Sequence, residues 1–228
     1  TDTDTDTDTD TDTDTDTDTD TDTDTDTDTE PEPTNLLSDA GFESYTKDSE
    51  GGVALGSDWI VYPGDNPAYA IVVTGTELYN SKELFEAPEG MAGLKTYGPW
   101  WGWPAELSIY QEWAKPTAGD SFTLTGWGYH HSADPLTVAH TYSELAVKYF
   151  DDSWNLLGHD KSDRISHETA TDTWTEVSVT STVPEGATLM QAVVTQWQCN
   201  GDEGADTSGN CWDGNGGVYW DNLSFVQN

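Results

Sequence analysis

The most restrictive feature of the sequence is a succession of short segments with β-strand character. β-branched and aromatic residues are concentrated in them, and no stretch keeps a helical period between recognisable caps. Turn signals at 118–120, 151–153 and 184–186 separate several of these segments. Many short strands at this spacing predict an all-β fold, a β-sandwich of two antiparallel sheets. The expected strands cover 69–74, 93–97, 107–113, 121–131, 143–150, 154–157, 173–180, 188–198 and 217–226.

A strict Thr-Asp dipeptide repeat occupies residues 1–29, and Glu-Pro-Glu-Pro follows it at 30–33. The repeat has no apolar residue and its carboxylates repel one another, so residues 1–33 are predicted to be a disordered acidic linker. We favour a spacer between modules, while a Thr-rich acceptor of O-linked glycans and a weak calcium binder are the alternatives. Residues 34–228 have the length of one domain.

The net charge of the domain limits the classes of molecule that it can bind. The formal net charge is −37, and the linker holds 16 of the 44 acidic residues, so 28 acidic and seven basic residues leave about −21 on the domain. This balance disfavours nucleic acids and anionic membranes, which need a cationic surface. It favours neutral polysaccharides over sulfated or uronate ones, unless a local basic patch overrides the net charge. Acidity also suits calcium binding.

Cysteine usage and the chain's start suggest a secreted protein. Cys199 and Cys211 flank eleven residues of loop-like composition, so a disulfide between them is expected, with two free thiols as the alternative. There is no signal peptide and no apolar run of about 20 residues. Because the chain begins inside a linker, we expect a module cut from a longer protein that is extracellular or at the cell surface, and monomeric as a module.

Aromatic residues exceed what a core requires. The chain has 11 Trp and 10 Tyr but only 5 Phe, and flat aromatic faces stack on sugar rings. In 121–131, Phe122 and Leu124 alternate with Trp127 and Tyr129, which predicts an outward position for the latter pair. The same argument places Trp197 outward and Met190 inward. The expected ligand-binding residues are therefore Trp100, Trp101 and Trp103 of the loop 98–104, together with Trp127, Tyr129 and Trp197, and with Gln111 and Gln191 as hydroxyl readers.

Five motifs stand in a fixed order between residues 35 and 228. They are NLLSDAGFE at 35–43, EG and GLK within 89–95, IYQ and AGDSFTLT within 109–125, WTEV and VPEGA within 174–187, and VYWDNLSF at 218–225. Together they resemble the β-jelly-roll carbohydrate-binding modules of families four, nine, sixteen and twenty-two, found in secreted bacterial polysaccharide-degrading enzymes. The resemblance implies a jelly roll, a polysaccharide ligand and a covalently tethered catalytic domain. Because 45–88, 98–106 and the inter-cysteine loop depart from the pattern, it does not specify the sugar.

The resemblance also implies a structural calcium ion. The positions that match its ligands are Glu43, Asp221 and the main-chain oxygen of Lys95, with Asp39 as an addition. Calcium takes six to eight oxygen ligands, which carboxylates and carbonyls supply. The alternative is that Glu43 and Asp221 only cap turns.

Catalysis is not expected. A hydrolase needs two carboxylates across the scissile bond, and no strand carries a pattern that would place them. Arg164 is the single arginine, which makes a uronate lyase hard to assemble, and His130 and His131 should point to opposite faces of a strand. No nucleophile elbow, zinc pattern or phosphate loop is present. A structural or adhesive surface domain is the second interpretation, and a jelly-roll lyase or hydrolase the third.

Overall fold

The computed structural model describes residues 33–47, 53–62, 69–74, 88, 90–99, 104–200 and 216–228. They belong to the unit Pro33–Asn228, and the other unit, Thr1–Glu32, lies outside the described residues. Nowhere in the described ranges is there a helix of the length and apolarity that crossing a membrane requires. The strands are β1 (Thr46–Lys47), β2 (Val53–Ala54), β3 (Ile60–Tyr62), β4 (Tyr69–Thr74), β5 (Ala92–Tyr97), β6 (Ala105–Ala114), β7 (Ser121–Tyr129), β8 (Tyr142–Phe150), β9 (Leu156–Ile165), β10 (Thr175–Thr182), β11 (Leu189–Gln198) and β12 (Val218–Gln227).

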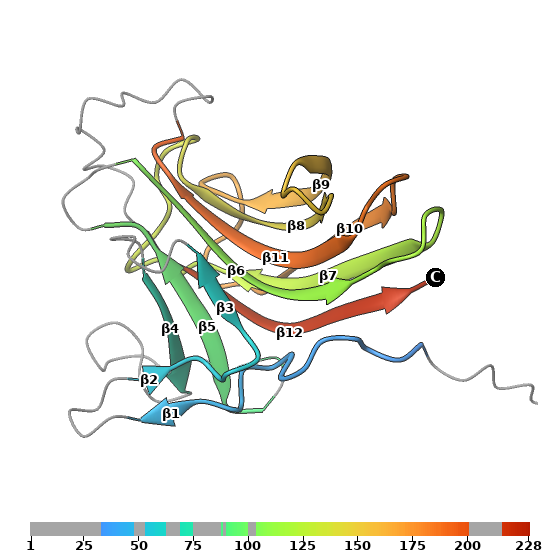
Figure 1. Cartoon of the computed structure of the whole chain (residues 1–228). Coiled ribbons are helices and arrows are strands. Elements are labelled where there is room, and N and C mark those ends of the chain that lie inside the picture. Colours follow the sequence, from blue (N-terminus) through green and yellow to red (C-terminus); the bar gives the residue numbers. More distant parts are fainter. Residues whose placement is uncertain are drawn as a thin grey trace, which may run out of the picture. The chain divides into compact units, whose positions relative to one another are not determined.

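Ten of these strands form two antiparallel sheets, and the predicted all-β sandwich is confirmed. The first sheet has the order β10-β7-β12-β5-β4, and the second sheet has the order β3-β6-β11-β8-β9. In Figure 1, β8 and β11 of the second sheet lie above β7 and β12 of the first. Strands β1 and β2 form a separate two-stranded ribbon.

The core lies between the two sheets, and side-chain alternation determines which residues enter it. Phe122 and Leu124 of β7 are buried there, as are Met190, Ala192 and Val194 of β11. Successive side chains of a strand point to opposite faces, so their neighbours in sequence point outward. The inward and outward assignments made for these two strands from the sequence are confirmed.

Two glycines of β7 allow core side chains to approach the backbone closely, Leu223 from the neighbouring strand β12 and Ile165 from β9 of the opposite sheet. A Cβ atom at Gly126 would lie 2.2 Å from Leu223 Cδ2, and one at Gly128 would lie 2.4 Å from Ile165 Cγ1. The buried indole of Trp220 donates from Nε1 to Ser143 Oγ at 2.9 Å, which joins the two sheets. Close packing therefore requires glycine at two successive inward positions of β7.

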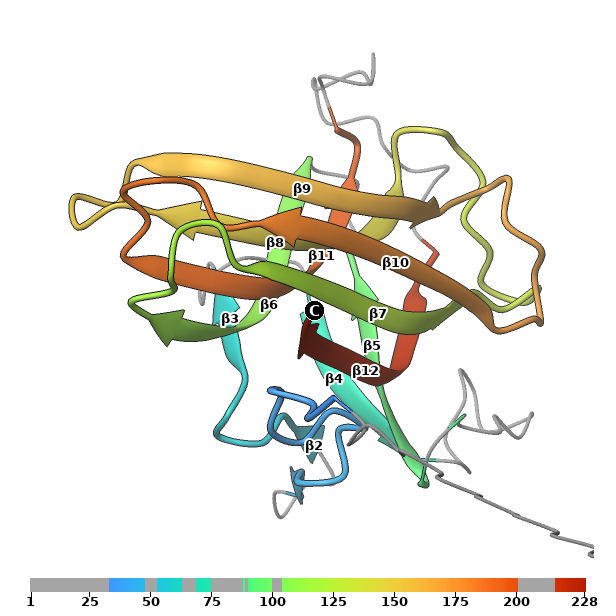
Figure 2. The same ribbon diagram turned by 90° about the vertical axis from the view of Figure 1, so that its right-hand side faces the viewer.

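Hydrogen bonds join two further pairs of segments in the sandwich. Strands β9 and β10 run alongside each other (Figure 2), and Ser181 Oγ donates to Asp160 Oδ2 between them at 2.5 Å. The opening segment lies against the C-terminal half of β12, beyond the residues that pair with β5; there Leu36 N–H donates to Phe225 O at 2.8 Å and Asn35 Nδ2 donates to Leu223 O at 2.9 Å. The first and last motifs of the sequence thus lie side by side.

Most predicted strands are present, with informative differences. Strand β9 reaches Ile165 instead of ending at 157. The prediction stopped too early because β9 is an edge strand whose residues are mostly polar and show no alternation of apolar and polar residues. Strands β1 to β3 were not predicted, and each has only two or three residues. Trp154 was expected to begin the strand over 154–157, but it occupies the turn before β9 with φ of 63° and is 63% exposed.

Candidate functional site

The outer face of the second sheet carries a mixed set of aromatic and charged side chains. Cross-strand pairing aligns Tyr110 with Val193, Glu106 with Trp197, and Gln191 with Lys148. Since the intervening residues of the same strands enter the core, these side chains point away from it. The residues that define this outer face are Ile60, Tyr62, Glu106, Ser108, Tyr110, Glu112, Tyr142, Glu144, Ala146, Lys148, His159, Lys161, Arg164, Gln191, Val193, Thr195 and Trp197.

Trp197 lines a hollow at one end of this face. The hollow has a volume of about 190 Å³, and Glu106 and Asn200 contribute polar groups to its wall. Trp197 Nε1 is buried, and no hydrogen-bond partner for it exists among the described residues. Thr195 Oγ1, two residues earlier on the same face, is likewise buried without a partner. A flat indole beside unsatisfied polar groups suits a ligand that offers both C–H surface and hydroxyl groups.

Tyr142 connects this hollow to the charged part of the face. Its ring centroid lies 6.4 Å from that of Trp197, and the guanidinium carbon of Arg164 lies 3.8 Å from it on the other side. Asn200 Nδ2 donates to the Tyr142 hydroxyl at 2.9 Å. Tyr142 is fully buried, so it serves as the fixed element on which Trp197 and Arg164 are positioned.

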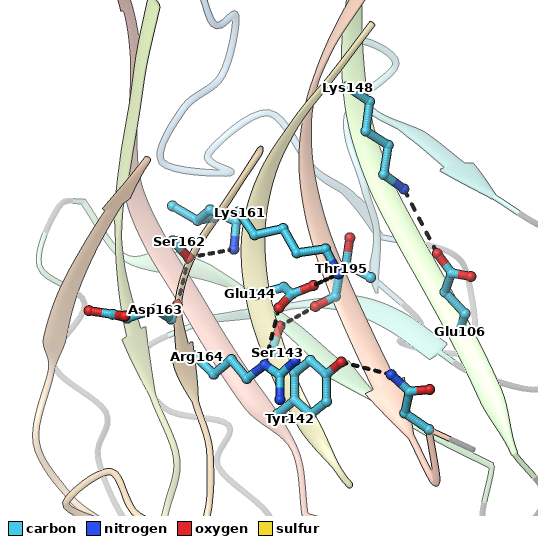
Figure 3. A network of polar contacts seen from close by, with 12 residues as sticks. Glu106, Tyr142, Ser143, Glu144, Lys148, Lys161, Ser162, Asp163, Arg164 and Thr195 are labelled. Carbon is cyan, nitrogen blue, oxygen red and sulfur yellow. Dashed lines mark hydrogen bonds and ion pairs between the residues drawn. The ribbon is translucent and has the colours of Figure 1, made fainter. Parts of the chain in front are cut away.

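Glu144 lies at the centre of the charged part, as Figure 3 shows. Lys161 Nζ approaches its Oε1 at 2.9 Å, and Arg164 Nε donates to its Oε2 at 3.4 Å. The Glu144 side chain is only 2% exposed, whereas those of Lys161 and Arg164 are 36% and 34% exposed. The carboxylate is therefore covered by its two cationic partners.

A second ion pair involves Lys148, which lies further along β8. Lys148 Nζ is 3.8 Å from Glu106 Oε1, and burial lowers the pKa of Lys148 although Glu106 counteracts this. His159 is the cross-strand neighbour of Lys148, and its Nε2 is buried without a partner among the described residues. Burial, with Lys148 and Lys161 nearby, lowers the pKa of His159 to about 4. The imidazole is thus neutral at physiological pH and sits in a locally positive environment.

A larger hollow, of about 500 Å³, lies beside Arg164 along β9 and the turn that follows it. Ser162, Ser166 and Thr169 contribute to its wall, as do the acidic residues Asp163 and Glu168. Hydroxyl groups and carboxylates suit the hydroxyls of a sugar better than they suit an anion.

The predicted binding residues do not share one surface. Trp127 and Tyr129 point outward from β7 of the first sheet, whereas Trp197 and Gln191 point outward from β11 of the second. The core lies between these two faces, so these residues cannot form one binding surface. Tyr129 packs on Trp174 with ring centroids 5.2 Å apart, and its hydroxyl donates to Asp172 Oδ1 at 3.2 Å.

Gln111 was expected to form hydrogen bonds with ligand hydroxyl groups, but it points inward from β6. Its Oε1 accepts a hydrogen bond from Ser38 N–H at 3.0 Å, and its Nε2 donates to Ser38 O. Both ends of the amide therefore bind the opening segment. Gln191 does lie on the outer face of the second sheet, where its Nε2 donates to Glu112 Oε2 at 3.2 Å.

Several other expectations fall outside the described residues. Trp100, Trp101 and Trp103 belong to this group, and so does Cys211. Cys199 is buried at the end of β11, and no cysteine among the described residues has a free thiol. The disulfide between Cys199 and Cys211 stays a prediction.

The residues expected to bind calcium occupy the region where the opening segment meets β5 and β12. Glu43 Oε1 accepts from Met91 N–H at 2.6 Å and Ala92 N–H at 2.8 Å. Asp221 is fully buried and its Oδ1 accepts from Asn222 N–H at 2.7 Å. Across the described ranges, no three side chains of His, Cys, Asp or Glu are grouped so as to hold a metal. Calcium at this place would thus depend on main-chain oxygens, such as that of Lys95, for much of its coordination.

Comparison with known proteins supports the fold. No protein-family model matches the chain, and no curated protein matches it. An arabinose-bound MgGH51 α-L-arabinofuranosidase matches with a TM-score of 0.53 and 12% identity, over 85% of this chain and 26% of that one. The chain shares the fold of the matched part of that enzyme. At this identity the likeness concerns the fold alone, and this chain spans about a quarter of that enzyme.

Carbohydrate-binding modules are also among the similar structures. The CBM22-1 xylan-binding domain of Paenibacillus barcinonensis Xyn10C has a TM-score of 0.49 and 13% identity, over 86% of this chain and 95% of that domain. TmCBM61 in complex with β-1,4-galactotriose has a TM-score of 0.47 and 14% identity, over 86% of this chain and 99% of that one.

Sequence reasoning missed the charged part of the outer face. Glu144, Lys161 and Arg164 were not predicted as a group, because β9 was predicted to end before either cation. Part of the signal was present in the turn at 151–153, which joins β8 to β9 as a hairpin and so places the residues after 157 beside β8. Two register shifts between these strands are needed to bring residues 144 and 164 opposite each other.

Proposed function

We propose that residues 34–228 form a non-catalytic carbohydrate-binding module that binds a polysaccharide on the outer face of the second sheet. The observation that carries the proposal is the position of Trp197. Its indole lines a surface hollow with Glu106 and Asn200, and its Nε1 is a buried donor with no partner among the described residues. Stacking on an indole with hydroxyl recognition beside it is a common way to bind a sugar.

The module would serve an enzyme tethered in the same parent protein. A ligand held by the module raises the effective concentration of polysaccharide at a neighbouring active site, even where the module's own affinity is modest. The Thr-Asp repeat would act as the spacer, and the protein would be secreted, with Cys199 and Cys211 joined in a disulfide.

Affinity electrophoresis against a panel of soluble plant and algal polysaccharides tests the proposal. We expect retardation in at least one gel and its loss in Trp197→Ala. Trp154→Ala is the matched control, since Trp154 is a 63% exposed indole on the β8–β9 turn. Trp127→Ala tests the outer face of the first sheet and should leave binding intact. No retardation of the folded protein by any glycan, or full binding by Trp197→Ala, would contradict the proposal.

We also propose that Glu43, Asp221 and the main-chain oxygen of Lys95, with Asp39, hold a structural calcium ion. Two observations support this. A carboxylate as buried as that of Asp221 requires strong compensation, and Asp39 Oδ2 is buried without a partner among the described residues. We expect calcium to raise the thermal midpoint and chelation to lower it, with Asp221→Asn insensitive to both. Asp152→Asn, in the β8–β9 turn, should respond like the wild type; an unchanged midpoint in calcium would refute the site.

A further inference from the structure

The few basic residues of this chain are unevenly distributed. Only seven are present among 228 residues, and Lys148, Lys161 and Arg164 all lie on the outer face of the second sheet. They occupy β8 and β9, whereas the acidic residues Glu106 and Glu112 lie on β6 at the other side of β11. The outer face is thus polarised across its strands, with its cations at one side.

The geometry around Glu144 makes the surface of that side cationic. Around Glu144, two cations share one carboxylate, which leaves one positive charge in excess on the outer face, while Asp163 and Glu168 line the hollow beside Arg164. The carboxylate is 2% exposed while Lys161 and Arg164 are about one-third exposed, so an approaching solute meets the cations first. Glu144 holds both groups at 2.9 and 3.4 Å from beneath and so orients them.

Arg164 is also fixed by packing. Its guanidinium stacks on the Tyr142 ring at 3.8 Å, and the Tyr142 hydroxyl accepts from Asn200. A guanidinium with a fixed plane loses little conformational entropy when it binds a carboxylate. Tyr142 lies between Arg164 and Trp197, so a ligand stacked at Trp197 extends naturally towards the cations.

We propose that Lys161 and Arg164 bind a uronic acid carboxylate of the polysaccharide, whose backbone is otherwise neutral. This inference rests on the proposed function and names its ligand class. It replaces the expectation of a purely neutral glycan, which came from the net charge alone. We further infer that only some sugar units of the ligand carry a carboxylate, which we call sparse placement. A domain with a net charge of about −21 repels a polymer that is charged at every sugar unit.

Matched polymer pairs provide the test. Each pair is a polysaccharide with uronic acid side groups and the same polymer after its carboxyl groups have been reduced to alcohols. Suitable backbones are a glucuronic-acid-substituted xylan, a glucuronic-acid-substituted arabinogalactan and xanthan, with a polygalacturonate as the fully charged comparison. Affinity is measured by isothermal titration calorimetry at 20 and 500 mM salt.

We expect at least one native polymer to bind about ten-fold more tightly than its reduced form at low salt, and the difference to shrink at high salt. Lys161→Met and Arg164→Gln should each abolish the difference while keeping binding to the reduced polymer. Lys115→Met, which removes an exposed lysine in the turn after β6, is the matched control and should behave as the wild type.

The outcomes separate the two proposals. Equal binding of native and reduced polymers overturns the carboxylate site and leaves the proposed function standing. Binding of none of these polymers, together with no retardation by any glycan of the panel, overturns both. A preference for native polymer that survives in folded Lys161→Met and Arg164→Gln places the carboxylate elsewhere and overturns the assignment. Tightest binding to polygalacturonate refutes the sparse placement. Should one variant fail to fold, the other still tests the assignment, and the wild-type comparison of native with reduced polymer still decides whether a carboxylate is bound.

Discussion

Replacing Glu144 by Gln should destabilise the protein by about 2 kcal/mol at neutral pH. The change keeps the size of the side chain and removes the charge that Lys161 and Arg164 share. At 2.9 Å, Coulomb's law gives about 1.4 kcal/mol in water and about 6 kcal/mol at an effective dielectric constant of 20. Since both cations are about one-third exposed, water screens them and the lower part of this range applies.

Urea denaturation at low salt measures this loss, and a double-mutant cycle with Lys161→Met isolates the pair. The two changes together should cost at least 0.5 kcal/mol less than their sum, an order of magnitude typical of coupled contacts. Glu185→Gln, at an exposed turn, is the control and should change stability by less than about 0.5 kcal/mol. If Glu144→Gln is as stable as the wild type, or the cycle is additive, then Glu144 does not organise the two cations.

Three further predictions concern other parts of the fold. Gly128→Ala should cost about 1–3 kcal/mol in urea denaturation, because its Cβ would lie 2.4 Å from Ile165 Cγ1; Ile165→Ala, which removes that atom, should cost less in this variant than in the wild type, and an unchanged midpoint for Gly128→Ala would refute the close approach. Gln111→Met should cost about 1–3 kcal/mol, since it leaves Ser38 N–H and C=O without the amide, yet glycan affinity should be unchanged; lost affinity in the folded variant would return Gln111 to the binding site. The folded pKa of His159, about 4, is below its unfolded value near 6.5, so the unfolded state binds more protons between these values and wild-type stability should fall as the pH drops from about 6.5 to 4. After a discount for solvent screening we expect about 1–2 kcal/mol over that window, absent in His159→Gln but kept in the exposed control His167→Gln; parallel pH profiles for wild type and His159→Gln would refute the shift.

The sequence predicts the orientation of a strand better than its place in a sheet. Phe122 and Leu124 identify the inward side of β7 by local alternation, so Trp127 and Tyr129 were correctly assigned outward. The sheet to which a strand belongs depends on non-local pairing, which alternation does not contain. For that reason Trp127, Tyr129 and Trp197 were grouped as ligand-binding residues, although β7 and β11 belong to opposite sheets.

Gln111 illustrates an error that the pattern itself could have prevented. It shares the parity of Leu107 and Ile109, which are core residues of the same strand. Its polar amide suggested an outward position, but an inward amide is acceptable where both of its ends find backbone partners, as they do at Ser38. The charged part of the outer face could not have been predicted in this way. The approach of Arg164 to Glu144 depends on a bulged β8–β9 register, which composition does not reveal.

Net charge misleads about this chain because it averages over a molecule much larger than the range of the electrostatic interaction. At physiological ionic strength exposed charges are screened beyond about 8 Å. A ligand at Arg164 therefore responds mainly to Glu144, Lys161 and the groups beside them, and hardly to the acidic residues of other surfaces. The chain has only seven basic residues, and three of them lie on one sheet face. Their position says more about the charge that a ligand meets there than the net charge of −37 does. The acidic surface and the cationic cluster then have separate effects, since the former disfavours highly charged polymers and the latter favours a single carboxylate at a defined place.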